Sequence, residues 1–213
     1  MTKCQTALLL TLMAALLFLA TAGMFNATPT YDEPQHFRYG EKVLRLAPER
    51  DEPGFDSKMP ISVLNVIPWE IAKWVGWDSL ITSNAVRQFA GTHPTAEEIR
   101  KISEYVAIVP GRMVTILFSL ILAWVVFTWA RELYGINAAL VSLTCCVLSP
   151  NILAHSNLVT VDLYAALLTT ASLYLYWKFL NYGGQKWAAL SALTLGLSQL
   201  AKYSCLLLYP IFF

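Results

Sequence analysis

Charged residues are scarce in this sequence, and they are unevenly placed. Asp, Glu, Lys and Arg make up 14% of the 213 residues, while hydrophobic residues make up 56%. A soluble domain usually carries about a quarter of charged residues. Twelve of the fourteen acids and nine of the fifteen basic residues lie between positions 32 and 104. The rest of the chain is almost free of charge, which argues against a soluble globular protein.

The sequence also lacks an excess of charge of either sign and a cysteine framework. The formal net charge is +1, so no nucleic-acid partner is predicted. The four cysteines are Cys4, Cys145, Cys146 and Cys205. All four lie outside the polar segment, where an oxidising compartment would act on them, and we interpret them as small apolar residues. The sequence contains no Cys/His spacing typical of a metal site.

Long apolar runs fill the charge-poor regions and predict membrane-spanning helices. A hydrocarbon core about 30 Å thick needs roughly 17–25 apolar residues in a helix. The predicted spans are 7–23, 113–130, one within 133–161, 163–177 and 187–201. A final run of eleven residues follows Lys202 and predicts a sixth span that is cut short. The expected fold class is therefore all-α, a multi-pass transmembrane helical protein.

The first run has two interpretations. Lys3, the apolar stretch and Ala20-Thr21-Ala22 resemble a cleavable signal peptide. The alternative is a retained first span, and the motif that follows it, described below, favours this second interpretation.

Basic residues in the short loops predict the orientation of the chain. If the spans alternate, four of these residues share one side, which should be the cytoplasm. They are Lys3, Arg131, Lys178 and Lys186. The chain then divides into a first span (1–23), an extracytoplasmic loop (24–110) and further spans (111–213). We expect a cell-membrane protein whose functional polar groups lie on the periplasmic or extracellular face.

The extracytoplasmic loop is predicted to contain short amphipathic helices. Thr95 and Glu98 form a capping-box pattern. Apolar residues then follow at helical spacing, at Ile99, Ile102 and Val106. A second helix is predicted over 61–77, where aliphatic residues accompany three tryptophans. Aromatic rings favour the membrane interface, so we expect this helix to lie there, with an ordinary soluble amphipathic helix as the alternative.

Two adjacent acids follow the first span. Asp32 and Glu33 emerge at the predicted membrane surface, where two carboxylates can provide a general base and an orienting partner. A structural alternative is equally available, because Asp32 can cap a helix whose first turn holds Pro34.

A lone acid, Asp162, opens an otherwise apolar helix after a polar junction that contains His155. An acid at the centre of a membrane helix costs roughly 2.5–3.5 kcal/mol on insertion scales, so acids within membranes usually face protein or water. At a helix end this cost is smaller, and helix capping is the alternative to function. His155 is a weaker candidate for binding substrate.

Isolated cations occur on the predicted outer face. Lys58 precedes Met59-Pro60, Arg112 opens the second long apolar run, and Lys202 stands between two apolar runs. Such cations can hold a phosphate at the lipid surface. The alternative is that each extends toward lipid headgroups as an anchor.

Taken in order, these features resemble one family. A first span and an Asp-Glu pair precede a large outer segment, and an Arg opens the second span. A Leu-Ala-His…Leu-Val-Thr-x-Asp junction ends at Asp162, and Leu-x-x-Leu-Ala-Lys-Tyr contains Lys202. The chain thus resembles, over nearly all its length, the C-type polyprenyl-phosphate-dependent glycosyltransferases. The similar group contains the protein O-mannosyltransferases and the bacterial lipid A aminoarabinose transferases.

The resemblance implies an enzyme that transfers a sugar from a polyprenyl-phosphate donor to a protein or lipid acceptor in the membrane. Asp32 would be the catalytic base, with Glu33 beside it, and the acceptor hydroxyl would invert the anomeric carbon. Asp162 would be a second acid of the acceptor or metal region. Countercharge for the phosphate leaving group would come from Lys58, Arg112 and Lys202, with His155 as a further substrate-binding candidate.

The sequence also departs from the family pattern. Relatives often have an acid or His directly before a Pro-Pro element, whereas this chain reads Asp56-Ser57-Lys58-Met59-Pro60. The cofactor therefore stays unknown, and a divalent cation is the candidate. Family members are commonly about twice this length, so the chain is expected to be an N-terminal portion. The alternative functions are a transporter or flippase subunit and an inactive remnant of the enzyme.

Overall fold

The computed structural model describes residues 1–47, 58–90 and 94–212. All regular structure in these residues is helical, which confirms the all-α prediction. The elements are α1 (Lys3–Asn26), α2 (Glu33–Leu44), η1 (Pro60–Ser62), α3 (Val63–Val75), α4 (Asp78–Phe89), α5 (Ala96–Tyr134), α6 (Ile136–Val147), α7 (Pro150–Ser156), α8 (Asp162–Tyr182), α9 (Gln185–Gln199), η2 (Tyr203–Leu208) and α10 (Tyr209–Phe212).

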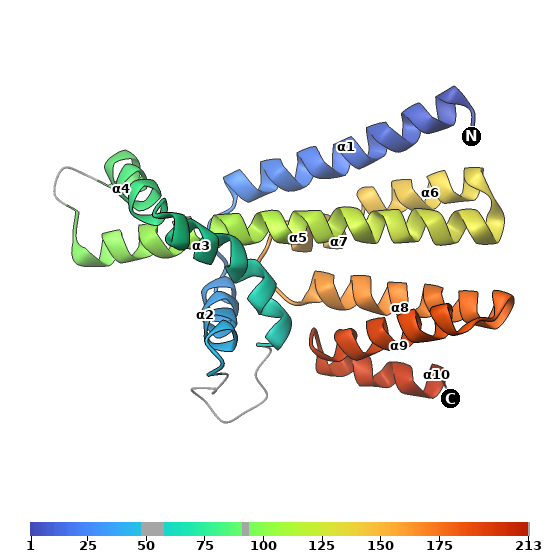
Figure 1. The fold of residues 1–213 in the computed structure, drawn as a ribbon. Helices are drawn as coiled ribbons and strands as arrows, with labels where there is room; N and C mark the ends of the chain where they lie inside the picture. The colour runs from blue at the N-terminus through green and yellow to red at the C-terminus, as the bar shows by residue number, and fades with distance from the viewer. Residues whose placement is uncertain (48–57, 91–93, 213) are drawn as a thin grey trace.

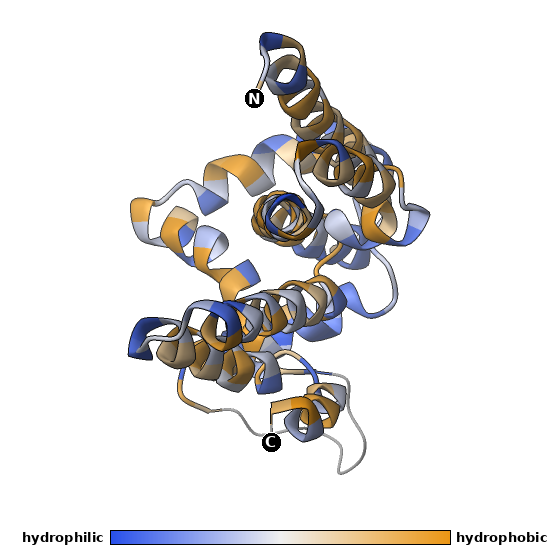
Figure 2. Ribbon diagram, turned by 90° about the vertical axis from the view of Figure 1, so that its right-hand side faces the viewer, coloured by the Kyte–Doolittle hydropathy of each residue, from blue (hydrophilic) through white to orange (hydrophobic). Residues whose placement is uncertain are grey.

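The long helices form a bundle with a cap of shorter helices at one end. Helices α1, α5, α6, α8 and α9 run lengthwise, while α2, α3 and α4 gather beside the first part of α5 (Figure 1). Figure 2 looks along α5 and shows that the bundle helices are mainly hydrophobic. Leu16 of α1, Phe127 of α5 and Leu143 of α6 are buried together in the largest apolar cluster. Helix α1 packs in this cluster, and its retention as the first span stays a prediction.

Among the residues that the structure describes, two helices are long and apolar enough to cross a membrane, namely α1 and α5. Helices α6 and α7 qualify together as a third, broken span, because they meet at a bend of 62°. Helices α8 and α9 occupy two further predicted spans without meeting the same criteria in the described residues. The multi-pass prediction is therefore confirmed. That α8 and α9 are also complete spans, which would make five in all, stays a prediction.

Helix α5 joins the cap to the bundle as one element of 39 residues. At 1.5 Å per residue it is roughly 60 Å long, about twice the thickness of a hydrocarbon core. The predicted capping box is confirmed at its start: the Thr95 hydroxyl accepts from the Glu98 backbone N–H, and the Thr95 N–H donates to the Glu98 carboxylate. The sequence pattern did not predict that the helix continues through Pro110.

The helices of the cap approach one another closely at two glycines. A Cβ at Gly40 of α2 would lie 2.6 Å from the Ser62 carbonyl oxygen, and a Cβ at Gly111 of α5 would lie 2.6 Å from the Asn65 carbonyl oxygen. Only glycine leaves room for these backbones. Lys73 of α3 adds an ion pair 3.2 Å from Glu41 of α2. Burial alone would lower the pKa of Lys73, but its hydrogen bonds to Glu70 and Glu41 outweigh it and raise the pKa.

Gly111→Ala should destabilise the protein by about 1–3 kcal/mol, because the added methyl group would push against the Asn65 backbone. Gly196→Ala in α9 is the matched control, since no described atom would lie within 4 Å of its Cβ. There the change should be neutral or stabilising by about 0.5–1 kcal/mol, the usual gain of Ala over Gly inside a helix. Thermal unfolding of both variants in detergent measures the difference. Equal midpoints would contradict the close packing at Gly111.

The α3–α4 corner exposes large apolar side chains. Trp74 is 88% exposed, Trp77 60% and Ile71 56%. The helix predicted over 61–77 is confirmed as η1 and α3, which ends at Gly76 in a left-handed conformation. Its position in the membrane interface stays a prediction that these exposed tryptophans support.

The polar loops fall at the two ends of the bundle. The N-terminus, the α5–α6 connection and the α8–α9 turn lie at the end opposite to the cap (Figure 1). Three of the four basic residues used for the orientation flank these connections, and Lys178 lies in the last part of α8. The arrangement agrees with the alternation of the predicted spans.

A cysteine probe at Tyr31 should react with a membrane-impermeant reagent added outside intact cells, and a probe at Gly184 should be spared. Tyr31 is 86% exposed in the cap, and Gly184 is exposed at the opposite end. The background must lack Cys4 and Cys145, which are exposed in the wild type. The reverse labelling pattern would place the cap in the cytoplasm and contradict the predicted orientation.

Candidate functional site

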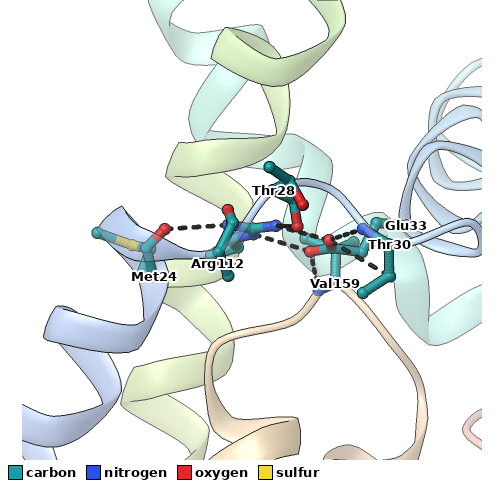
Figure 3. A network of polar contacts seen from close by, with 7 residues as sticks. Met24, Thr28, Thr30, Glu33, Arg112 and Val159 are labelled. Atoms are coloured by element: carbon teal, nitrogen blue, oxygen red, sulfur yellow. Dashed lines mark hydrogen bonds and ion pairs between the residues drawn. The ribbon is translucent and has the colours of Figure 1, made fainter.

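A buried ion pair between Glu33 and Arg112 lies where the cap meets the bundle (Figure 3). Both side chains are fully buried. The Arg112 Nε donates to Glu33 Oε1 at 2.8 Å, and Nη2 donates to Oε2 at 2.7 Å. The remaining N–H groups donate to the carbonyl oxygens of Met24 (3.0 Å), Ala27 (2.8 Å) and Thr28 (3.2 Å). All five guanidinium donors are thus engaged.

The Glu33 carboxylate has further partners that join separate parts of the chain. Its Oε2 accepts from the backbone N–H of Thr30 at 2.9 Å, and its Oε1 accepts from the backbone N–H of Val159 at 2.9 Å. The pair therefore fixes the α1–α2 connection to both α5 and the α7–α8 connection. Removing one member of such a pair would leave a buried charge without its partner, which is strongly destabilising.

This geometry favours a structural role for Glu33 and Arg112, whereas the sequence indicated a catalytic and a phosphate-binding role. The Arg112 guanidinium has no N–H group left for a donor phosphate, and the Glu33 carboxylate is held by five donors, which include the Thr30 hydroxyl at 3.4 Å. We therefore propose that both residues hold the site in place and neither contacts substrate. Position in the sequence does not separate the two roles, because a cation and an acid at the predicted membrane surface are equally suited to bind each other.

Asp32 lies directly before this anchored residue and is exposed. It occupies the N-cap position of α2, but its side chain makes no capping hydrogen bond in the described structure. The capping alternative considered for Asp32 is therefore not realised. Its carboxylate therefore lies at the protein surface, and the backbone beside it is held in place by the Glu33–Arg112 ion pair.

Three of the predicted residues meet at a second place. The Lys202 ammonium forms an ion pair with Asp162 Oδ1, and the His155 Nδ1 lies 3.9 Å from Asp162 Oδ2. The side chains are 47%, 38% and 42% exposed for Lys202, Asp162 and His155, so solvent reaches them. Asp162 is the first residue of α8, where its charge also favours the helix N-terminus.

A hollow of about 520 Å³ opens beside Asp162 and His155. It runs between α5, α7 and α8, and its lining below these two groups is mainly apolar, with Leu122, Val126, Ile152, Leu163 and Ala166. An apolar groove with a polar mouth is suited to a molecule that has a hydrocarbon chain and a polar head.

Lys58 lies near the same region, because the next residue, Met59, packs there. Met59 packs in one buried cluster with Val161, which precedes Asp162, and with Ala201, which precedes Lys202. The Ile61 N–H also donates to the Leu200 carbonyl oxygen at 3.1 Å. One apolar cluster therefore contains a sequence neighbour of each of the three charged residues, Lys58, Asp162 and Lys202. Within the described ranges no group of three or more His, Cys, Asp or Glu could hold a metal ion.

The fold and the site together define an all-α membrane protein with charged residues gathered where its long helices meet the cap. Residues 100–213, more than half of the chain, match the family described as dolichyl-phosphate-mannose-protein mannosyltransferase. The chain belongs to this family of membrane glycosyltransferases. No curated protein and no solved structure gives a match. The matched range contains Arg112, His155, Asp162 and Lys202, while Asp32 and Lys58 precede it.

Proposed function

We propose that this chain transfers a sugar from a polyprenyl-phosphate donor to a protein or lipid acceptor on the non-cytoplasmic face of the cell membrane. The acceptor hydroxyl attacks the anomeric carbon, and Asp32 takes its proton. The bond between that carbon and the phosphate oxygen breaks, and polyprenyl phosphate leaves with the electron pair. Attack opposite to the leaving group inverts the anomeric configuration.

The observation that carries this proposal is the placement of Asp32. Its side chain is exposed and is not used as a helix cap, while Glu33 beside it is fixed by a fully engaged Arg112. A general base needs a free carboxylate in a fixed place, because proton transfer requires hydrogen-bond distance to the reacting hydroxyl. Asp32 meets this requirement within the family to which the chain belongs.

The donor side of the site is proposed at Lys202 and Lys58. Phosphate bears negative charge and needs countercharge as it leaves. The Lys202–Asp162 pair is half-exposed, and exposed pairs contribute only about 0–1 kcal/mol, so a phosphate can compete with Asp162 for the lysine. The apolar hollow below Asp162 and His155 supports a donor with a hydrocarbon tail.

The proposal is tested by offering the complete protein, reconstituted in lipid vesicles, the same sugar on two carriers. Polyprenyl-phosphate mannose should serve as donor, whereas a nucleotide-linked mannose should not. The configuration of the new glycosidic bond, read by NMR, should be opposite to that of the donor. Transfer from the nucleotide sugar, or retention of configuration, would contradict the proposed chemistry. Lys202→Ala should raise the donor KM, with Lys186→Ala at the opposite end as the control.

A further inference from the structure

A second polar network is buried close to the candidate site, and its centre is Asn65 of α3. Asn65 is buried, with 1% of its surface exposed. Its amide nitrogen donates to the Gly111 carbonyl oxygen at 2.8 Å and to the Thr115 hydroxyl at 2.9 Å. Its amide oxygen accepts from the Tyr164 hydroxyl at 3.0 Å. One planar group thus holds α5 on one side and α8 on the other.

The hydrogen-bond partners of Asn65 lie close in sequence to the two parts of the candidate site, the Glu33–Arg112 pair and the Asp162–Lys202 pair. Gly111 directly precedes Arg112, which fixes Glu33 and, through it, Asp32. Tyr164 follows two residues after Asp162 in the first turn of α8. Asn65 itself contacts neither acid in any described hydrogen bond. It therefore lies where it can set the separation between Asp32, the proposed base, and the Asp162–Lys202 pair, where the donor phosphate is proposed to bind.

We propose that Asn65 is a positioning residue for sugar transfer, in that its amide holds α8 and α5 at the relative position that aligns Asp162 and Lys202 with Asp32. This inference rests on the proposed function. Apolar contacts between helices tolerate small sliding motions, because they have no preferred direction. Three hydrogen bonds from one rigid amide do not, since each weakens steeply when its angle changes.

The close contact of α3 with α5 supports this role. A Cβ at Gly111 would lie 2.6 Å from the Asn65 carbonyl oxygen and 3.2 Å from the Asn65 Cβ. The glycine lets the amide approach the α5 backbone, where a larger residue would force it away. A displacement of about 1 Å from a residue far from the chemistry can reduce a rate by about 100-fold, so precise contact here has a catalytic consequence.

A purely stabilising role is the alternative, and one variant separates the two. Asn65→Leu, Thr115→Val and Tyr164→Phe together replace the whole network by apolar groups of similar shape. The Gly111 carbonyl oxygen loses its Asn65 donor but stays inside α5, where the helix backbone can pair it, so the replacement can be nearly neutral for stability. Tyr174→Phe is the matched control, because it removes a hydroxyl from the same helix at the end remote from the site, where Tyr174 donates to Glu132 at 2.7 Å.

The triple variant of the complete protein should keep the unfolding midpoint and the donor KM of the wild type, while kcat falls by about tenfold to 100-fold. Tyr174→Phe should change none of the three. An unchanged kcat in the folded triple variant would overturn the proposal. If the triple variant does not fold, Tyr164→Phe alone replaces it, and again kcat must fall with KM unchanged.

A distance measurement keeps this inference separate from the proposed function. Spin labels carried by non-natural amino acids at Tyr31 and Ser204, both exposed, report the separation of the two sides of the site. The distribution should be narrow in the wild type and broader in the triple variant. An unchanged distribution would overturn the role of Asn65 whatever the activity. A broadened distribution in a protein that transfers no lipid-linked sugar would instead contradict the proposed function and the catalytic part of this inference.

Discussion

Asp32→Asn should reduce sugar transfer by about two or more orders of magnitude, the usual scale for loss of a general base. An amide cannot take a proton from the acceptor hydroxyl. Asparagine keeps the size of the side chain and is a good residue at a helix N-cap, so the start of α2 should stay intact. Because the wild-type side chain makes no capping hydrogen bond in the described structure, the only loss is the favourable interaction of its charge with the helix N-terminus, about 0.3–1 kcal/mol.

The measurement is transfer by matched amounts of purified wild-type and variant protein, with the unfolding midpoint and donor binding measured on the same samples. Asp78→Asn is the control, since Asp78 is another acid at the start of a helix of the cap. Its transfer rate should match that of the wild type. Near-normal transfer by Asp32→Asn would remove Asp32 from the mechanism and leave the site without its proposed base.

Arg112→Ala should destabilise the fold by about 3–5 kcal/mol, because it leaves the Glu33 carboxylate buried without its countercharge. Arg112→Lys should recover only part of this loss. Lysine keeps the charge but has three donors, and it cannot replace the planar fork that engages five groups. Removing both charges together, with Glu33→Leu and Arg112→Met, should destabilise much less than Arg112→Ala, since no buried charge stays unpaired.

Thermal unfolding in detergent compares these variants with Arg38→Ala. Arg38 also pairs with an acid, Glu104 at 2.7 Å, but its side chain is 58% exposed. An exposed pair contributes about 0–1 kcal/mol, so the control should change stability little. If Arg112→Ala unfolds at the same temperature as the wild type while donor affinity falls, Arg112 faces the phosphate after all and the structural role is refuted.

The local features of the fold were predictable because they depend on residues near one another in sequence. The capping box at Thr95 needs only two residues three positions apart, and it is present. The first span needs only an unbroken apolar run. The continuity of α5 through Pro110 was not predictable in this way, because packing against α3 stabilises a segment that its own residues would interrupt.

The same distinction between local and long-range features applies to the candidate site. Its charged residues were found individually, since a charge in an apolar region is conspicuous. Their pairing was not, because Glu33 and Arg112 are 79 positions apart and no sequence period relates them. Asn65 was missed altogether. The available signal was an amide inside the otherwise apolar stretch 63–69, which requires a buried partner if that face packs inward.

The hydrogen bond from Val159 to Glu33 has a consequence for how the protein is made. It joins residues 126 positions apart, so Glu33 leaves the ribosome long before its last partner. Until the α7–α8 connection arrives, the carboxylate lacks its Val159 donor and has only Thr30 and Arg112 as partners. The Asp32 side of the site therefore reaches its final form late in synthesis, when the later helices are in the membrane. Chains that stop before Val159 would carry the proposed base Asp32 beside a Glu33 that lacks this hydrogen bond.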